Sequence, residues 1–328
     1  MKNFPGGVKV SKLFIIGNGF DSAHGLQTSY ERFHQYLHSS YPAADENILM
    51  VPSVYQDKDG GLDCDDTEAV AFLIRIISEA ERRSEEKTEY DKRQCIWSTL
   101  EASLGKLDYS EVFDELIEPL DEDGDIDDWE NAYQNEDAAN GLAVVIEKFS
   151  DYFAEWISTI DISEAKPIKN FEKLIRPGDI FLNFNYTETL EKLYGIDNVY
   201  HIHGKRGDRL IFGHGEEEDK DYDNNMAYHT GAEGVLQDIF YSLKKDTKKA
   251  MDEHDDFFKA IMGGIDCIYS HGFSFGEVDQ PYIKRICEII KTEDITWYLN
   301  DFDPKKIPDF SQQLLRAGFK GKIDTFSI

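Results

Sequence analysis

The first candidates for binding chemistry are Gly17 and Gly19, which flank Asn18 near the start of the chain. They follow an apolar run, Leu-Phe-Ile-Ile at residues 13–16, that is rich in β-branched and aromatic side chains and too short for a helix. Such a run predicts a strand buried on both faces, as in the middle of a parallel sheet. Glycine removes the Cβ atoms that keep a ligand away from the backbone. A strand, this turn and then a helix predict backbone N–H groups presented to a phosphate.

The helix after this turn is predicted to begin later, at Thr28. Thr28 is a suitable N-cap, and Glu31 three residues on completes a capping box. Residues 20–27 are therefore expected to form a loop that folds over whatever the turn holds. The full dinucleotide fingerprint G-x-G-x-x-G is not met, because Ser22 stands where the third glycine belongs. A tight glycine turn without a ligand is the alternative interpretation of the same residues.

Small and polar residues follow the ends of four further predicted strands. His201 precedes His203 by two residues, so both are predicted on the same strand face. Ligands of open parallel sheets bind beyond the carboxyl ends of the strands, so these residues are expected along one rim. Each also has a structural interpretation, such as a helix cap, a turn residue or a strand end. The strands and the residues at their ends are 179–184 with Asn185, 198–202 with His203, 266–269 with Gly272 and Ser274, and 295–299 with Asn300.

The order of these elements predicts an α/β fold, a Rossmann-like, mostly parallel sheet with helices on both faces and an α-helical insertion. The predicted domains are residues 1–55 with 165–328, which bind the nucleotide, and 56–164, the insertion. Further strands are expected at 209–212 and 322–326. Apolar residues at helical spacing predict helices at 69–83, 95–107, 141–160, 187–194, 232–262, 280–290 and 310–317.

The composition of the 328-residue chain is that of a globular protein, with 41% hydrophobic and 13% aromatic residues. Its formal net charge is −30, from 65 acidic and 35 basic residues. A field of this sign disfavours general nucleic-acid binding and anionic membranes. No apolar stretch approaches the roughly 18 residues of a membrane span, and the amino terminus lacks the apolar core of a signal peptide. We therefore expect a cytoplasmic protein without a membrane partner.

No metal site is expected. The four cysteines form no C-x-x-C pair, which argues against a zinc ribbon and favours buried free thiols. The acidic run at residues 119–137 misses the register of a calcium loop, so it is expected to be a solvated loop. Asp279 is expected to cap the helix that begins near Pro281. Glu101 is expected on a helix face, with a place at the ligand site as the alternative.

Several motifs taken together resemble the AbiH family of phage abortive-infection proteins. They are IIGNGFD at residues 15–21, WSTLE at 97–101, NFNYTETLE at 183–191, HIHG at 201–204, GFSF at 272–275 followed by Asp279, and YLN at 298–300. The resemblance spans nearly the whole chain. It implies a role in defence against phage. Because that family in turn resembles sirtuin-like proteins, it also implies the binding of NAD.

The sirtuin resemblance implies a role for each residue at the strand ends. The turn at residues 17–19 is implied to hold the pyrophosphate, and Asn185 to position the nicotinamide ribose and a water. His203 is implied to act as base or as the partner of a ribose hydroxyl group. Asp21 stands where sirtuins have a small hydroxyl residue, and the paired C-x-x-C motifs of the deacetylases are missing, so deacylation is not implied. The residues implied to bind the nucleotide are Gly17, Asn18, Gly19, Phe20, Asp21, His201, Gly272, Ser274 and Asn300.

The function that follows is hydrolysis of NAD⁺, as substrate, to nicotinamide and ADP-ribose without a metal. Cleavage passes through an oxocarbenium-like centre, so a site must mainly orient the ribose and a water, which an asparagine amide can do. A histidine can accept the proton of that water. The alternative is a sensor of a nucleotide or ADP-ribose derivative without turnover; a nuclease-like effector is disfavoured by the negative charge. A homo-oligomer formed through the aromatic-rich insertion is a further hypothesis, although no heptad repeat supports it.

Overall fold

The computed structural model describes residues 11–45, 52–85 and 97–328 and divides into two compact units. The first unit contains the described residues of Met1–Thr28, with Ile157–Ile211 and Asp246–Ile328. The second contains the described residues of Ser29–Trp156, with Phe212–Lys245. Each unit buries apolar side chains of its own.

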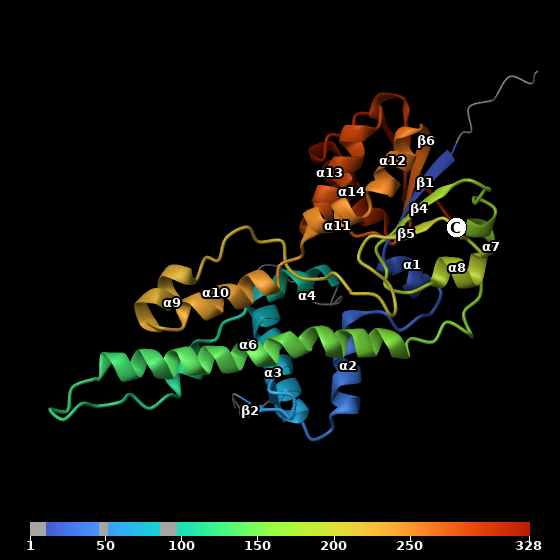
Figure 1. The fold of residues 1–328 in the computed structure, drawn as a ribbon. Coiled ribbons are helices and arrows are strands. Elements are labelled where there is room, and N and C mark those ends of the chain that lie inside the picture. The colour runs from blue at the N-terminus through green and yellow to red at the C-terminus, as the bar shows by residue number, and fades with distance from the viewer. Residues whose placement is uncertain (1–10, 46–51, 86–96) are drawn as a thin grey trace, which may run out of the picture. The chain divides into compact units, whose positions relative to one another are not determined.

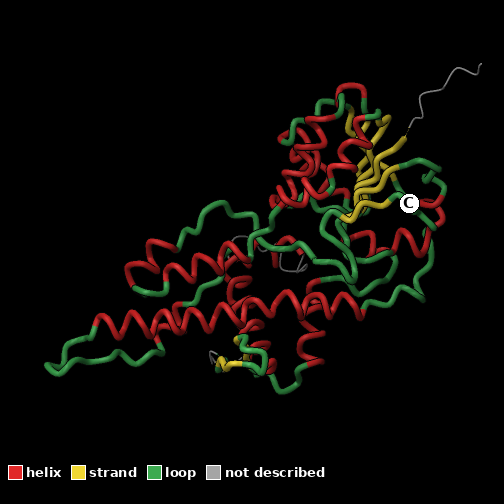
Figure 2. Tube along the Cα trace, viewed as in Figure 1, coloured by secondary structure: helices red, strands yellow, loops and turns green. Residues whose placement is uncertain are grey.

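The first unit is built on a six-stranded parallel sheet (Figures 1 and 2). Its spatial order is β5-β4-β1-β6-β7-β8, and every neighbouring pair is parallel. Counted along the chain within this sheet, the order is 3-2-1-4-5-6, which is that of a Rossmann fold. The prediction of a Rossmann-like sheet is confirmed. The strands are β1 (Ser11–Ile16), β4 (Ile180–Asn183), β5 (Val199–His201), β6 (Ile265–His271), β7 (Thr296–Asn300) and β8 (Lys322–Phe326).

Helices cover both faces of this sheet, and the side chains of its central strands alternate between two apolar cores. Leu13 and Ile15 of β1 pack in one core with residues of α11 (Thr247–Glu253), α12 (Asp255–Met262), α13 (Gln280–Ile289) and α14 (Ile307–Arg316). Phe14 and Ile16 pack in the other core with residues of α1 (Asn18–Ala23), α7 (Lys169–Glu172) and α8 (Thr189–Tyr194). The central strand is therefore buried on both sides, as its apolar run predicted.

The second unit is mainly helical. Phe33 of α2 packs edge-on against Phe149 and Phe153 of α6, with ring centroids 5.7 Å and 5.6 Å apart. Glu101 of α4 forms a buried ion pair with Lys245 inside this unit. Its elements are α2 (Tyr30–Ser40), the hairpin β2 (Val54–Gln56) and β3 (Leu62–Cys64), α3 (Asp66–Glu85), α4 (Trp97–Leu104), α5 (Ser110–Asp114), α6 (Asp128–Thr159, to Trp156), α9 (Tyr222–Tyr228) and α10 (Glu233–Ser242).

Contacts place residues 29–45, 52–55 and 212–245 in the helical unit, whereas the sequence analysis assigned them to the nucleotide-binding domain. The division into residues 1–55 with 165–328 and residues 56–164 stays a prediction. The predicted helix at 232–262 is interrupted, because it consists of α10, α11 and α12. At the interruption, the Asp246 carboxylate accepts a hydrogen bond from the backbone N–H of Lys249 and caps α11.

Two sequence predictions of local structure are wrong. Residues 209–212 form no strand; the Ile211 N–H donates to the carbonyl oxygen of His203 at 2.9 Å, and Gly207 and Gly213 turn the chain with φ values of 88° and 133°. The acidic run is a loop only as far as Asp127, because residues 128–137 belong to α6. The Asp127 carboxylate accepts hydrogen bonds from the N–H groups of Trp129 and Glu130, both at 3.1 Å, and so caps that helix.

Candidate functional site

The parallel sheet brings the ends of five strands to one edge. Gly17, Asn185, His203 and Gly272 follow the carboxyl ends of β1, β4, β5 and β6, and Asn300 ends β7. In a sheet of this order the chain reverses direction between β1 and β6, and ligands bind in sheets of this class beyond that point. The edge at which the sequence analysis expected its candidate residues is therefore the one at which the structure places them.

The glycines at the switch point allow two backbone segments to pack directly on each other. The N–H groups of Gly17 and Gly19 donate to the carbonyl oxygens of His271 and Gly272, both at 3.0 Å. A Cβ atom on Gly17 would lie 2.6 Å from the Gly272 oxygen, and one on Gly272 would lie 2.2 Å from the Phe20 nitrogen. Gly272 also has a φ of 67°. In this arrangement the N–H groups of Gly17 and Gly19 both bind protein carbonyls. The absence of Cβ atoms therefore allows the segment after β1 to pack on the segment after β6.

The loop expected at residues 20–27 is confirmed only for residues 24–27, because helix α1 (Asn18–Ala23) begins at Asn18 and includes residues 20–23. Gly17 is its N-cap, in an extended conformation with φ −123° and ψ −177°. The helix buries Phe20, which contacts Phe171 of α7 with ring centroids 4.9 Å apart. The N-cap expected at Thr28 is also wrong, since Ser29 takes that position before α2. Burial of Phe20 stabilises a helix too short to be stable by itself.

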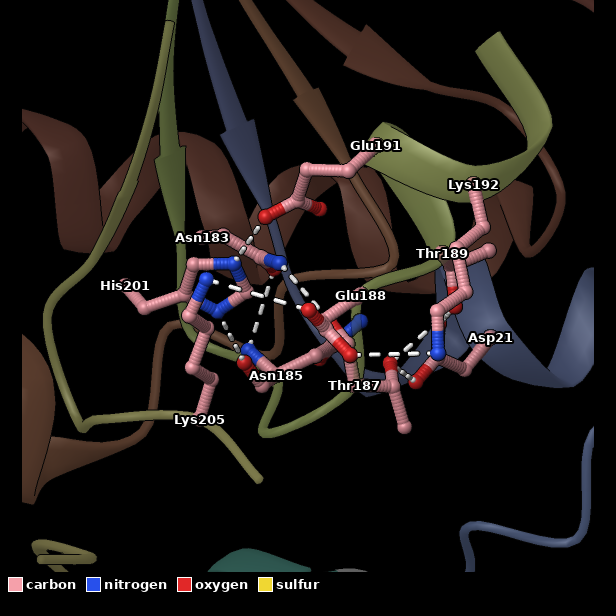
Figure 3. A network of polar contacts seen from close by, with 10 residues as sticks. All are labelled: Asp21, Asn183, Asn185, Thr187, Glu188, Thr189, Glu191, Lys192, His201 and Lys205. Atoms are coloured by element: carbon pink, nitrogen blue, oxygen red, sulfur yellow. Dashed lines mark hydrogen bonds and ion pairs between the residues drawn. The ribbon is translucent and has the colours of Figure 1, made fainter. Parts of the chain in front are cut away.

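A buried carboxyl group lies beside the switch point (Figure 3). Asp21 of α1 accepts hydrogen bonds from the hydroxyl groups of Thr187 and Thr189, at 2.5 Å and 2.7 Å. Burial raises the pKa of Asp21 to about 6, although the hydrogen bonds from Thr187, Thr189 and Asn185 lower it. Removal from water disfavours the charged form, and the hydroxyl donors offset only part of this cost. The group therefore titrates close to neutral pH.

Asn185 is held from several sides. Its side-chain amide donates to the carbonyl oxygen of Gly17 at 3.1 Å, and its N–H donates to the side-chain oxygen of Asn183 at 3.1 Å. Its carbonyl oxygen accepts from Nδ1 of His201 at 3.0 Å, and the other ring nitrogen of His201 lies 2.7 Å from Oε1 of Glu191. Figure 3 shows the side chains of Asn183, Asn185, Glu191 and His201 in this network. Asn185 thus joins the ends of β4, β1 and β5.

His203 does not share a face with His201, which corrects the sequence prediction. Strand β5 ends at His201, and the following turn is closed by a hydrogen bond from the Gly204 N–H to the His201 carbonyl at 3.0 Å. The His203 ring contacts Phe184 and Tyr282, which pack in the core under α11–α14. His201 instead pairs with α8 on the opposite face. Side chains two residues apart share a face only within a strand, and β5 ends at His201, before His203.

Asp279 faces His203, so its predicted role as a helix cap is wrong. It occupies the N-cap position of α13 without a side-chain capping hydrogen bond. Its Oδ1 atom lies 3.5 Å from Nε2 of His203, and both residues are buried. A carboxylate at this distance can orient the imidazole. The His203–Asp279 pair was not expected from the sequence.

The remaining predicted residues lie on the same edge with separate surroundings. Ser274 is exposed and Asn18 is half-buried. Asn300 is half-buried, and its side-chain oxygen accepts from the Phe302 N–H at 3.3 Å. Direct contacts join other predicted residues, namely Gly17, Asp21, Asn185, His201 and Gly272.

A buried histidine that the sequence analysis did not single out ends β6. Among the described residues, neither ring nitrogen of His271 has a hydrogen-bond partner. Its ring lies among Phe20, Phe171 and Phe326, with centroids 5.2 Å, 5.9 Å and 6.3 Å away. Burial lowers the pKa of His271 to about 4, so the ring is neutral at neutral pH.

Thr187, Thr189 and Glu191 were also missed by the sequence analysis. Their alternation in the segment NYTETLE after β4 is the sequence signal that marks them.

Within residues 11–45, 52–85 and 97–328, no group of three or more His, Cys, Asp or Glu side chains is placed to hold a metal ion. Cys64 is a buried free thiol, whereas Cys267 and Cys287 are only half-buried, which corrects the expectation for those two. Cys95 lies outside the described residues. None of the helices within the described ranges is both long enough and apolar enough to span a bilayer.

Fold and site define a Rossmann-like α/β protein with a polar network at the carboxyl edge of its sheet. Residues 13–301 match the family described as bacteriophage abortive infection AbiH, so the chain belongs to the AbiH family. The family resemblance seen in the sequence is thereby confirmed. Searches of curated proteins and of solved structures gave no significant match. The relation to sirtuin-like proteins stays a prediction.

Proposed function

We propose that this protein is an abortive-infection effector that binds NAD⁺ and hydrolyses it to nicotinamide and ADP-ribose. Family membership supports the role in abortive infection. The observation that carries the enzymatic part is the placement of Asn185 and His203 at the carboxyl edge of a sheet of Rossmann order, where such sheets bind nucleotides.

The proposed chemistry assigns one task to each group. Cleavage of the nicotinamide–ribose bond develops positive charge on the ribose, so the site must place the ribose and a water in line. The Asn185 amide orients that water. His203 accepts its proton, which contributes about 10²- to 10⁴-fold to the rate. Asp279 positions the His203 ring from 3.5 Å. His201 and Glu191 hold the backbone of Asn185 in place.

The pyrophosphate must be bound differently from the sequence-based expectation. The N–H groups of Gly17 and Gly19 donate to carbonyl oxygens, so they are engaged in this arrangement. Asn18, Ser22 and Ser274 lie on the same edge and are half-buried or exposed, so we propose that their side chains supply the donors. Side-chain donors of this kind offset the net charge of −30, which repels an anionic ligand.

Burial of the two proposed catalytic side chains points to a resting state. Asn185 and His203 are 5% and 3% exposed, and the Asn185 amide donates to Gly17 rather than to a ligand. Turnover therefore requires a local rearrangement that releases the amide. This fits an effector that is held inactive until infection.

The hydrogen bond from the Asn185 amide to Gly17 also supports a second candidate function, a nucleotide sensor. If the Asn185 amide remains bonded to Gly17, the site binds NAD⁺ or an ADP-ribose derivative without positioning a water. A sensor needs binding and a change in conformation, but no base. The two functions differ in whether nicotinamide is released.

The experiment compares turnover with binding. Purified protein is incubated with NAD⁺ and free nicotinamide is quantified by chromatography, for the wild type and for Asn185→Ala and His203→Ala. Isothermal titration with NAD⁺ and ADP-ribose is run in parallel. Nicotinamide release that both substitutions abolish supports the hydrolase. Binding of ADP-ribose without release supports the sensor, and full hydrolysis by a folded His203→Ala protein contradicts the assignment.

A further inference from the structure

A single segment of the second unit carries half of the net charge of the protein. Residues 107–147 contain 15 Asp and Glu residues and no Lys or Arg, against a net charge of −30 for the whole chain. The segment includes the loop between α5 and α6, which Figure 1 shows at the amino-terminal end of α6. The proposed NAD chemistry does not use this segment.

The loop has a defined conformation. Leu120 and Ile126 form an antiparallel bridge, and the Asp121 N–H donates to the Asp125 carbonyl at 2.8 Å. The Asp121 carboxylate accepts from the N–H groups of Asp123 and Asp125, at 2.9 Å and 3.0 Å. These bonds fix the backbone, so the side chains of the loop present a preformed surface.

Large apolar side chains are exposed among these acidic residues. Leu120 and Ile126 lie opposite each other across the bridge. Trp129 and Tyr133 are four residues apart on α6, so they lie on the same helix face. Trp129 is 79% exposed, whereas large aromatic residues are normally well buried. We call this set the acidic–apolar surface: Ile117, Leu120, Ile126, Trp129 and Tyr133, with the carboxylates of residues 114–130.

We propose that the acidic–apolar surface docks a basic polypeptide segment that carries apolar side chains among its lysines and arginines. Exposed apolar clusters of this kind mark interaction sites, and the charge around them selects the partner. The same negative charge disfavours three other candidate partners of this surface. A second copy of the surface, an anionic membrane and a nucleic acid are all repelled by it.

This chemistry matches the exposed face of a nucleic-acid-binding protein, which is basic and often carries aromatic side chains. Aromatic residues such as Trp129 and Tyr133 commonly supply most of the binding energy of an interface, while complementary charges speed association and exclude wrong partners. The inference does not depend on the proposed hydrolysis of NAD⁺, because it concerns a different unit and a different ligand.

The test uses the full-length protein and two synthetic peptides of 18 residues. The first is a leucine–lysine peptide that forms a helix with one apolar and one basic face; in the second, every leucine is replaced by glutamine. Affinities are measured by fluorescence anisotropy for the wild type, Trp129→Ser and Leu120→Ser. Leu315→Ser is the matched control, because Leu315 lies on α14 and is 60% exposed, close to the 64% of Leu120.

We expect the apolar-faced peptide to bind the wild type, and Trp129→Ser to weaken that binding roughly tenfold or more. Leu120→Ser should weaken it as well, whereas Leu315→Ser should not. The glutamine peptide should bind at least roughly tenfold more weakly. Equal binding of both peptides, equal loss in Leu315→Ser, or no binding at all overturns the proposal. Wild-type dimers that Trp129→Ser dissociates would also overturn it. Thermal melts check that each variant is folded.

Discussion

Replacing Asp21 with asparagine tests whether this buried carboxyl group gives the fold a pH dependence. Burial raises the pKa of Asp21 from 3.8 to about 6, so the folded protein retains a proton that the unfolded chain releases between these values. The stabilising contribution is complete below pH 3.8 and is lost as the pH rises through about 6. This difference in pKa corresponds to a total of about 3 kcal/mol.

The assay is urea unfolding of the wild type and of Asp21→Asn at several pH values from 5 to 7.5, above the isoelectric point of about 4.6. Relative to the variant, the wild type should lose about 1 kcal/mol between pH 5 and pH 6, and little more above pH 7. The comparison with a variant is essential because His271 acts in the opposite direction. Burial lowers its pKa from 6.5 to about 4, so its contribution to stability grows as the pH rises through this range.

Thr187→Val provides a further control, because it removes one hydroxyl group that stabilises the charged carboxylate. The pKa of Asp21 should then rise further, and the loss of stability should extend to higher pH. Parallel stability curves for the wild type and Asp21→Asn would refute the reasoning, since they would mean that Asp21 has the same pKa in the folded and unfolded states.

Three other substitutions test separate parts of the account. Gly272→Ala should lower the free energy of unfolding, measured in urea, by at least about 3 kcal/mol, because it combines a positive φ with a backbone clash. Gly25→Ala, at φ 76° with open space around it, should lower it by only about 1 kcal/mol. Equal losses would argue against close packing at the switch point. His271→Phe should raise the free energy of unfolding by about 1 kcal/mol, by replacing a buried polar ring with an apolar one; destabilisation would indicate a partner for that ring. Asp279→Asn should slow NAD⁺ hydrolysis about tenfold, because the His203 ring loses the carboxylate that positions it; an unchanged rate would remove its positioning role.

The sheet could be predicted from the sequence because its central strands β1 and β4 are buried on both faces. A short apolar run followed by glycine or a polar residue marks β1, β4 and β6, and their alternation with helices implies a parallel sheet. All strands of a parallel sheet have their carboxyl ends at the same edge, so the position of the candidate residues followed from the fold class alone.

Features that depend on contacts between distant residues could not be predicted in this way. Helix α1 has six residues and is stabilised by the burial of Phe20 and by bonds from Asp21 to Thr187 and Thr189, more than 160 positions later. Local sequence carries no signal for such bonds. The direction of His203 depends on where β5 ends, and strand ends are the least certain part of a sequence-based assignment.

The prediction that Asp279 caps α13 was wrong for a similar reason. Asp279 has the residue type and position of an N-cap, yet its carboxylate faces His203 from a distant strand end. A tertiary contact with His203 took the place of a local capping hydrogen bond. Polar residues that break a local rule in this way are candidates for function.

A crystal structure of His203→Ala with NAD⁺ tests the central claim most directly, because this variant should bind the dinucleotide without cleaving it. The account predicts intact NAD⁺ beyond the carboxyl ends of β1 and β6, with the nicotinamide ribose beside Asn185 and the Asn185 amide released from Gly17. NAD⁺ bound elsewhere on the protein, or no binding at saturating concentration, would contradict it.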